Sequence, residues 1–404
     1  MVRRGSAISE LARPGSTDRI AMPRRAGTKA NKASAAALNN TARDAARALT
    51  VLEGWLEGLL PAHAEPEVVL HSGIDSNGMS SETLVLDATW TEGGSRDTVP
   101  MVARVAPAPQ DFPVFPRYEL GHQYEVIRQV GELTDVPVPG VRWLEESGEV
   151  LGTPFFLMDR VEGVVPPDVL PYPFGDNWLF DADRTDQRRL QDSTVDVLAR
   201  LHAIEDPLGR FGYLAPEQDG ETLLHRNLAK VRAWYDFAVR DLAPSPTVER
   251  ALAWLEAHVP TAEEQGDPVL CWGDARIGNV IYRDFEPVAV LDWEMVTLGP
   301  RALDVSWLLF AHQVFESIVG MLELPGMPHF LREEDVVATY AERTGVTLGD
   351  LDWYHVYNGL QWCIVFMRTG ARQVHFGEIE MPADIESLFH CKPLLESILA
   401  KVGA

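Results

Sequence analysis

Three oxygen-bearing side chains, Asp274, Asn279 and Asp292, border short apolar runs in the segment 269–294. Transfer of a γ-phosphoryl group needs a carboxylate that orients the incoming hydroxyl, and oxygen ligands for Mg²⁺. Asp274 has the position of the orienting carboxylate, whereas Asn279 and Asp292 have the positions of the metal ligands. Their order and spacing therefore predict phosphoryl transfer from a magnesium nucleotide to a small molecule.

The elements around these residues must bring them together. Asp274 follows the strand-like run 269–271, and four residues separate it from Asn279. The β-rich runs 280–282 and 288–291 flank a turn-rich connector, which predicts a β-hairpin. A hairpin returns the chain to its starting point, so we expect Asp292 to lie beside Asn279.

The alternative interpretation is that these residues simply form turns. Asp and Asn are common in turns because their side chains hydrogen-bond to their own backbone, and any one of the three alone is more often a turn residue. The combination favours catalysis: an Asp-x4-Asn loop, a hairpin and a second Asp directly after an apolar strand seldom coincide by chance.

The segment from Leu270 to Leu309 resembles the aminoglycoside phosphotransferase and choline kinase-like family. It is closest to the bacterial branch related to the kinase-like domain of some acyl-CoA dehydrogenases. The resemblance rests on Trp272-Gly-Asp, Asn279, Asp292-Trp-Glu and the run 298–307, Leu-Gly-Pro-Arg-Ala-Leu-Asp-Val-Ser-Trp. One departure is that Trp272 stands where the family usually has His, a residue thought to support the loop. The resemblance implies an α+β, two-lobed protein-kinase-like fold with a small β-rich N-lobe and a larger, mainly helical C-lobe.

The N-lobe should supply the phosphate-binding groups. The polar turn from Gly73 to Ser81 is suited to present backbone N–H groups to phosphate oxygens, with Ser80 and Ser81 as candidate contacts, although a simple β-turn would look similar. The strand 99–105 carries Arg104 where the family has a cation directed at the α- and β-phosphates. An exposed charge at a strand end is the alternative for Arg104.

Two further nucleotide-site predictions come from the resemblance. The helical pattern over 118–130 places Gln123 where the family usually offers Glu to the strand cation, and Glu119 lies one turn earlier, so either is a candidate partner of Arg104. The apolar run 155–158 resembles the last N-lobe strand and the linker to the larger lobe. Backbone groups near Met158 would then meet the adenine, although a plain buried strand would look the same.

The rest of the chain is predicted to be helical. The run 192–204 has the apolar periodicity of a core-facing helix, and its His202 is more often a packing residue than a catalyst. Further helices are expected at about 224–239, 246–258, 302–317, 333–344 and 353–370. Their aromatic side chains could line a substrate pocket, but aromatic residues at helical spacing usually belong to the core.

Composition separates a tail from a body. Residues 1–40 hold eight Lys or Arg and two Asp or Glu, a net charge of +6 that leaves −31 in the other residues of a chain whose total is −25. The tail is rich in small residues and is expected to be disordered. The acidic body disfavours nucleic acid as a partner. The sequence has no apolar run long enough for a membrane span and no export signal pattern, and its three cysteines lack metal-ligand spacing, so a cytoplasmic location is expected.

These observations divide the chain into a tail (1–40), an N-terminal nucleotide-binding lobe (41–160) and a C-terminal catalytic and substrate-binding lobe (161–404). We expect a kinase that uses Mg²⁺ and ATP, or GTP, to phosphorylate a hydroxyl of a small molecule. The alternative is a nucleotide-binding pseudokinase without turnover, which the replacements at Trp272 and Gln123 motivate. The acceptor and the oligomeric state stay open.

Overall fold

The computed structural model describes residues 49–71 and 82–404. The elements below belong to one compact unit, residues 51–404. The whole expected phosphate-binding turn from Gly73 to Ser81, including Ser80 and Ser81, lies outside the described residues, as do residues 1–48.

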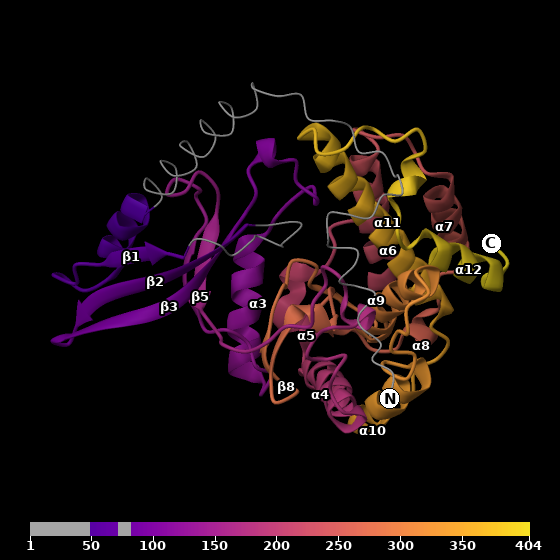
Figure 1. Cartoon of the computed structure of the whole chain (residues 1–404), viewed down its shortest axis with the longest axis horizontal. Helices are drawn as coiled ribbons and strands as arrows, with labels where there is room; N and C mark the ends of the chain where they lie inside the picture. The colour runs from indigo at the N-terminus through magenta and orange to yellow at the C-terminus, as the bar shows by residue number, and fades with distance from the viewer. Residues whose placement is uncertain (1–48, 72–81) are drawn as a thin grey trace, which may run out of the picture. The chain divides into compact units, whose positions relative to one another are not determined.

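The first lobe is built on an antiparallel five-stranded sheet of order β1-β2-β3-β5-β4 (Figure 1). Its strands are β1 (Glu67–Leu70), β2 (Glu82–Glu92), β3 (Ser95–Val105), β4 (Val141–Glu145) and β5 (Phe155–Asp159). Gly93 and Gly94 join β2 to β3 with φ of 59° and 87°, left-handed values that glycine adopts without strain. Because the pleat alternates, Met101, Ala103 and Val105 of β3 are buried on one face.

Helix α3 (Leu120–Leu133) contacts β4 and β5. It buries Leu120, Val126, Ile127 and Val130, which recur at helical spacing and form one apolar stripe. The prediction of a helix over 118–130 is confirmed, and the helix extends to Leu133. A further helical segment includes residues 51–59.

The second lobe is mainly helical. Its helices are α4 (Arg184–His202), α5 (Pro207–Phe211), α6 (Leu223–Ala238), α7 (Pro246–Ala257), α8 (Ala262–Gln265), α9 (Ala302–Met321), α10 (Glu333–Thr344), α11 (Asp352–His375) and α12 (Lys392–Val402). Five short 3-10 turns complete the described helical elements: η1 (Pro109–Asp111), η2 (Tyr172–Phe174), η3 (Gly212–Leu214), η4 (Ile277–Asn279) and η5 (Ile385–Leu388). The two-lobed α+β prediction is confirmed.

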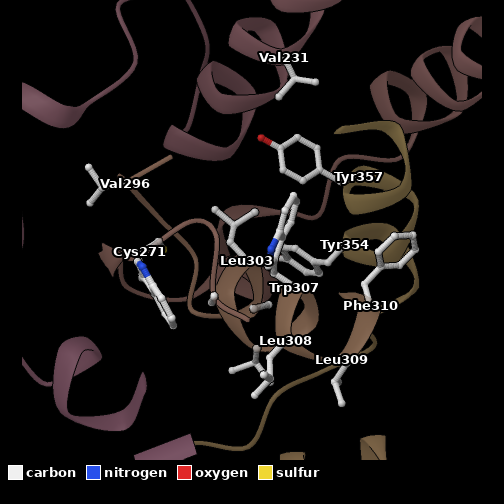
Figure 2. Close-up of a cluster of buried hydrophobic side chains, with 14 of the residues drawn as sticks. Val231, Cys271, Val296, Leu303, Trp307, Leu308, Leu309, Phe310, Tyr354 and Tyr357 are labelled. Atoms are coloured by element: carbon white, nitrogen blue, oxygen red, sulfur yellow. The ribbon is translucent and has the colours of Figure 1, made fainter. Parts of the chain in front are cut away.

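Helix α9 lies in the core of this lobe because most of its circumference is buried. It contacts α4, α10, α11 and α12. Figure 2 shows Leu303, Trp307 and Phe310 of α9 beside Tyr354 and Tyr357 of α11. The predicted helices of this lobe are all present, but α4 begins at Arg184 rather than near 192. Its first turns bury Gln187 and Gln191, and these polar residues interrupt the apolar pattern.

Two small antiparallel strand pairs frame the segment that carries the candidate catalytic residues. Strand β6 (Val269–Cys271) pairs with β9 (Thr297–Gly299), and β7 (Val280–Arg283) pairs with β8 (Glu286–Val290). Asp284 and Phe285 connect β7 to β8 with φ of 52° and 64°, a geometry typical of a tight hairpin. The hairpin prediction is therefore confirmed.

No helix in the ranges 49–71 and 82–404 is long and apolar enough to cross a lipid bilayer. The division of the chain at residues 40 and 160 stays a prediction. Strand β5 nevertheless ends the five-stranded sheet at Asp159, close to the expected second boundary.

Candidate active site

The carboxylate of Asp274 is held by three neighbouring side chains. Trp307 of α9 donates its indole N–H to Asp274 Oδ1 at 2.7 Å, and the amide of Asn279 donates to Oδ2 at 2.6 Å. Arg276 Nε lies 3.2 Å from both oxygens. Charge-assisted hydrogen bonds of this kind fix a carboxylate in one orientation. The side chain keeps 15% of its surface exposed, so a ligand can still reach it.

The backbone before Asp274 is anchored to a buried carboxylate. The N–H groups of Trp272 and Gly273 donate to Asp304 Oδ2 and Oδ1 at 2.7 and 2.8 Å. His202 Nε2 lies 3.1 Å from Asp304 Oδ2, and His202 Nδ1 lies 2.7 Å from the hydroxyl of Tyr340. The prediction that His202 is a packing residue is confirmed, because its ring supports the loop through Asp304.

Trp272 has a structural role at the position where the resembled family has His. Its ring is fully buried, and its indole N–H donates to the carbonyl oxygens of Leu291 and Asp292 at 2.9 and 3.3 Å. Trp272 thus ties the Asp274 loop to the chain around Asp292. Trp272 therefore supplies a hydrogen-bond donor between the two segments.

Asn279 and Asp292 are brought together by the hairpin, as predicted. The N–H of Leu291 donates to the carbonyl oxygen of Asn279 at 2.8 Å. Asn279 Nδ2 is committed to Asp274, which leaves its Oδ1 for another partner. Asp292 has a φ of 56°, in the left-handed region that Asp and Asn tolerate better than most residues. An amide oxygen and a carboxylate at adjoining positions form a donor set that fits Mg²⁺.

Arg104 reaches from β3 to the Asp292-Trp-Glu segment. Its Nη2 lies 2.7 Å from Asp292 Oδ1 and 3.2 Å from Glu294 Oε2. Burial opposes the charge on Arg104, but Asp292 and Glu294 outweigh that effect and raise the pKa of the guanidinium. The Nε and Nη1 donors of Arg104 have no recorded hydrogen bond to the residues that the structure describes.

The expected partners of Arg104 on α3 are therefore corrected. Glu119 lies 3.8 Å from Arg117 instead, and the Gln123 side chain is buried without a recorded hydrogen bond within the described ranges. Two carboxylates near the end of β8 satisfy the cation, which leaves α3 no electrostatic role toward it. Met158 lies half-buried on β5, opposite Val102 of β3, and its contact with adenine stays a prediction.

Several side chains that contact the candidate site residues were not predicted from the sequence. Glu294 and Asp304 lie within the quoted motifs but received no role, and Trp307 contacts Asp274 across 33 residues of sequence. Arg276 forms an ion pair with Asp168 as well as with Asp274. Burial opposes the charge on Arg276, yet the two carboxylates raise its pKa. The i,i+2 spacing of Asp292 and Glu294 is the one local feature of the sequence that could have indicated a second carboxylate beside Asp292.

Gly273 permits the close approach of two chain segments. Its φ is +93°, and a Cβ there would lie 2.1 Å from the carbonyl oxygen of Met295. We expect Gly273→Ala to lower the free energy of unfolding by at least about 1–3 kcal/mol from backbone strain alone. Gly320→Ala, on the exposed end of α9 with no atom within 4 Å, is the control and should be neutral or slightly stabilising. Urea unfolding of both variants checks this, and equal stabilities would contradict the packing described.

A cavity of about 220 Å³ opens beside this loop. Its lining includes Gly273, Glu294 and Trp307, so it borders the segments that hold Asp274 and Asp292. The helices α6 and α11 supply much of the opposite wall, including Trp234 and Tyr357. Trp234 and Tyr357 are buried core residues that also line the cavity, whereas Trp353 and Tyr354 are equally buried but do not line it.

The model of the phosphotransferase enzyme family matches residues 88–334, which is more than half of the chain. The matched range includes the site residues from Arg104 to Asp304. The chain belongs to this family. It is an enzyme of the phosphotransferase class, as the sequence predicted.

Solved structures share the fold. A Ralstonia eutropha JMP134 protein, provisionally named an aminoglycoside phosphotransferase, has a TM-score of 0.59 at 20% identity and covers 86% of this chain and 96% of its own. An ethanolamine kinase of Plasmodium vivax has a TM-score of 0.55 at 10% identity, with 85% and 87% covered. At these identities the likeness shows the fold alone.

Curated relatives are longer proteins. The chain is 26% identical over 270 residues to mouse acyl-CoA dehydrogenase family member 10, covering 65% of this chain and 22% of the relative. It is 23% identical over 268 residues to human acyl-CoA dehydrogenase family member 11, covering 63% and 32%. The phosphotransferase thus spans about a fifth to a third of these relatives.

One buried cluster in the phosphotransferase has side chains of the metal-ligating type: His202, Cys271 and Asp304. Both oxygens of Asp304 already accept backbone N–H groups. Burial, followed by the charge of Asp304, raises the pKa of the Cys271 thiol well above its usual value, which disfavours the thiolate that a metal needs. Within this cluster, Asp304 supports the Asp274 loop through the backbone of Trp272 and Gly273.

Proposed function

We propose that this phosphotransferase moves the γ-phosphoryl group of ATP, or GTP, to a hydroxyl of a small molecule with the help of Mg²⁺. The observation that carries the proposal is a continuous set of contacts. Asp274 is hydrogen-bonded to Asn279, the backbone of Asn279 to Leu291, and the neighbouring Asp292 to Arg104. A carboxylate, two oxygen ligands and a cation thus converge at one place, as phosphoryl transfer requires.

Asp274 orients the acceptor hydroxyl and accepts its proton. Trp307 and Asn279 hold the carboxylate in place, so little motion is needed when the acceptor arrives. Asn279 Oδ1 and the Asp292 carboxylate would hold Mg²⁺, which neutralises charge on the phosphate oxygens when bound. Attack of the hydroxyl oxygen on the γ-phosphorus forms the new P–O bond while the bond to the leaving diphosphate breaks.

Arg104 binds the nucleotide phosphates. One nitrogen of its guanidinium contacts Asp292 and Glu294, and the remaining donors can form paired bonds to phosphate oxygens. Backbone groups near Met158 meet the adenine, and Ser80 and Ser81 complete the phosphate site. These three assignments follow the family resemblance.

Neither of the two replacements that motivate a pseudokinase argues against turnover. Trp272 supplies the hydrogen bonds that join the Asp274 loop to the chain at Asp292, so its presence is compatible with turnover. Gln123 is no evidence for a pseudokinase either, because Arg104 forms its ion pairs with Asp292 and Glu294.

Asp292→Asn is the variant that tests the metal site. Asparagine tolerates the left-handed backbone at this position, so the fold should persist while the ligand charge is lost. We expect Mg²⁺ to strengthen binding of a fluorescent ATP analogue to the parent protein and to have little effect on the variant. Asp284→Asn, at the exposed hairpin turn, is the matched control and should behave as the parent. An undiminished Mg²⁺ effect in Asp292→Asn would contradict the proposal.

A further inference from the structure

The cavity borders the Asp274 loop, although Asp274 itself is not among its lining residues. Gly273, which directly precedes Asp274 in the chain, lines it. So does Trp307, which hydrogen-bonds to Asp274. Six labelled side chains in Figure 2 also line it: Val231, Cys271, Val296, Leu303, Trp307 and Tyr357. These six side chains form an apolar part of the wall, which suits the carbon skeleton of a small acceptor.

Among the residues that the structure describes, every carboxylate that lines the cavity already has an arginine partner. Glu217 lies 2.8 Å and Glu119 lies 3.8 Å from nitrogens of Arg117. Glu294 lies 3.2 Å from Arg104. An acceptor with several ammonium groups would thus have to displace existing ion pairs. Residues 41–404 carry a large net negative charge, but the described acids that line this cavity are all paired with arginines.

Lys230 of α6 stands in contrast to these acids. Of the three lysines within the described ranges, Lys392 pairs with Glu386 and Lys401 pairs with Asp352. Lys230 has no recorded hydrogen bond or ion pair with any residue that the structure describes, and it lines the cavity. Lys230 is a solvent-exposed residue of α6.

The surroundings of Lys230 leave its charge uncompensated. Desolvation by the surrounding protein atoms lowers the pKa of the ammonium, although the residue as a whole remains exposed, and the charge of Arg117 lowers it further. Glu119 and Glu217 act in the opposite direction but are outweighed. An anion placed in the cavity would supply the missing counter-charge.

We propose that Lys230 binds an anionic group of the acceptor, a carboxylate or a phosphate, while the hydroxyl of the same molecule is presented to Asp274. The apolar walls contact the carbon atoms between the two groups. This inference rests on the proposed function and deepens it, because it assigns the acceptor to the class of anionic alcohols. Arg117 is held by Glu119 and Glu217 and is less available for this role.

The first test is independent of turnover. The whole protein is reductively methylated with formaldehyde and dimethylamine–borane at constant ionic strength, and each lysine is quantified by peptide mass spectrometry. Sodium acetate and inorganic phosphate are the ligands used, with acetamide as the neutral comparison. We expect acetate or phosphate to slow methylation of Lys230 severalfold and to leave Lys401 unchanged. The more protective anion identifies the group, and the absence of protection by either would overturn the proposal.

The second test measures specificity. Hydroxycarboxylates, their amides, sugar phosphates, free sugars and amino alcohols are compared as acceptors. We expect Lys230→Gln to lower kcat/KM for the anionic acceptor by about 10- to 100-fold, mainly through KM, because a charge-assisted bond is lost. Lys230→Arg should recover part of the loss. Lys401→Gln is the control, and the affinity for nucleotide should be equal in all variants.

The two proposals fail in different ways. Protection of Lys230 by an anion without phosphorylation of any acceptor would count against the proposed function and leave the anion site intact. Turnover of neutral or amino alcohols with undiminished efficiency in Lys230→Gln would overturn the anion site and leave the phosphoryl transfer intact.

Discussion

Asp274→Asn should lower the rate of phosphoryl transfer by about 10²- to 10⁴-fold, because a positioned general base contributes that much. The asparagine side chain fills the same volume and can still accept the indole N–H of Trp307. It cannot accept the proton of the acceptor hydroxyl, and it offers one oxygen to donors that now contact two. Nucleotide affinity should change little, since Arg104 and Asp292 are untouched.

Steady-state assays of nucleotide consumption, with binding of a fluorescent nucleotide measured in parallel, separate these effects. The matched control is Asp284→Asn at the hairpin turn, where asparagine suits the left-handed backbone. Full activity of Asp274→Asn would show that another group accepts the proton.

Asp304→Ala should lower the free energy of unfolding by about 3–5 kcal/mol, the range found when one member of a buried charged network is removed. The carboxylate is fully buried and accepts the N–H groups of Trp272 and Gly273. Without it, two backbone donors and His202 lose their partner inside the core, and each unpaired group costs free energy. The loop that carries Asp274 would lose its anchor at the same time.

Urea unfolding followed by tryptophan fluorescence measures this loss. Asp352→Ala is the control, because Asp352 also lies in the first turn of a helix and forms an exposed ion pair with Lys401. Its loss should cost less than about 1 kcal/mol. Equal effects of the two substitutions would mean that the Asp304 network contributes no more than a surface pair.

The local part of the active site could be predicted from sequence. Asp274, Asn279 and the hairpin lie within one short segment, so turn residues and β-rich runs determine which side chains meet. Asp292 was predicted to lie beside Asn279 for the same reason, and the bond between Leu291 and Asn279 places the two segments together.

The partners of Arg104 could not be predicted in this way. Helical spacing over 118–130 predicts that Glu119 and Gln123 share one face, but it carries no information on which carboxylate another lobe presents. Arg104 bonds to Asp292 across 188 residues of sequence, and competition between carboxylates is decided by tertiary packing. Only the three-dimensional position of Glu294 shows that it pairs with Arg104 in place of a side chain on α3.

Lys230 had no signal in the sequence either. A lysine on an amphipathic helix is usually a solvated surface residue, and nothing in the neighbouring residues marks α6 as the wall of a cavity. The role of Lys230 depends on which charged groups line the rest of the cavity. Arg117, more than one hundred residues earlier, takes up two of the nearby acids, and this leaves Lys230 as the uncompensated charge.

Identification of a phosphorylated product tests the central claim most directly. The protein is incubated with Mg²⁺, ATP or GTP and a panel of alcohols that includes hydroxycarboxylates, sugar phosphates, sugars, amino alcohols and aminoglycosides. Mass spectrometry then searches for an acceptor heavier by one phosphoryl group. We predict such a product with the parent protein and its near absence with Asp274→Asn. Magnesium-dependent nucleotide binding without any product above the level of Asp274→Asn would contradict the assignment and favour the pseudokinase.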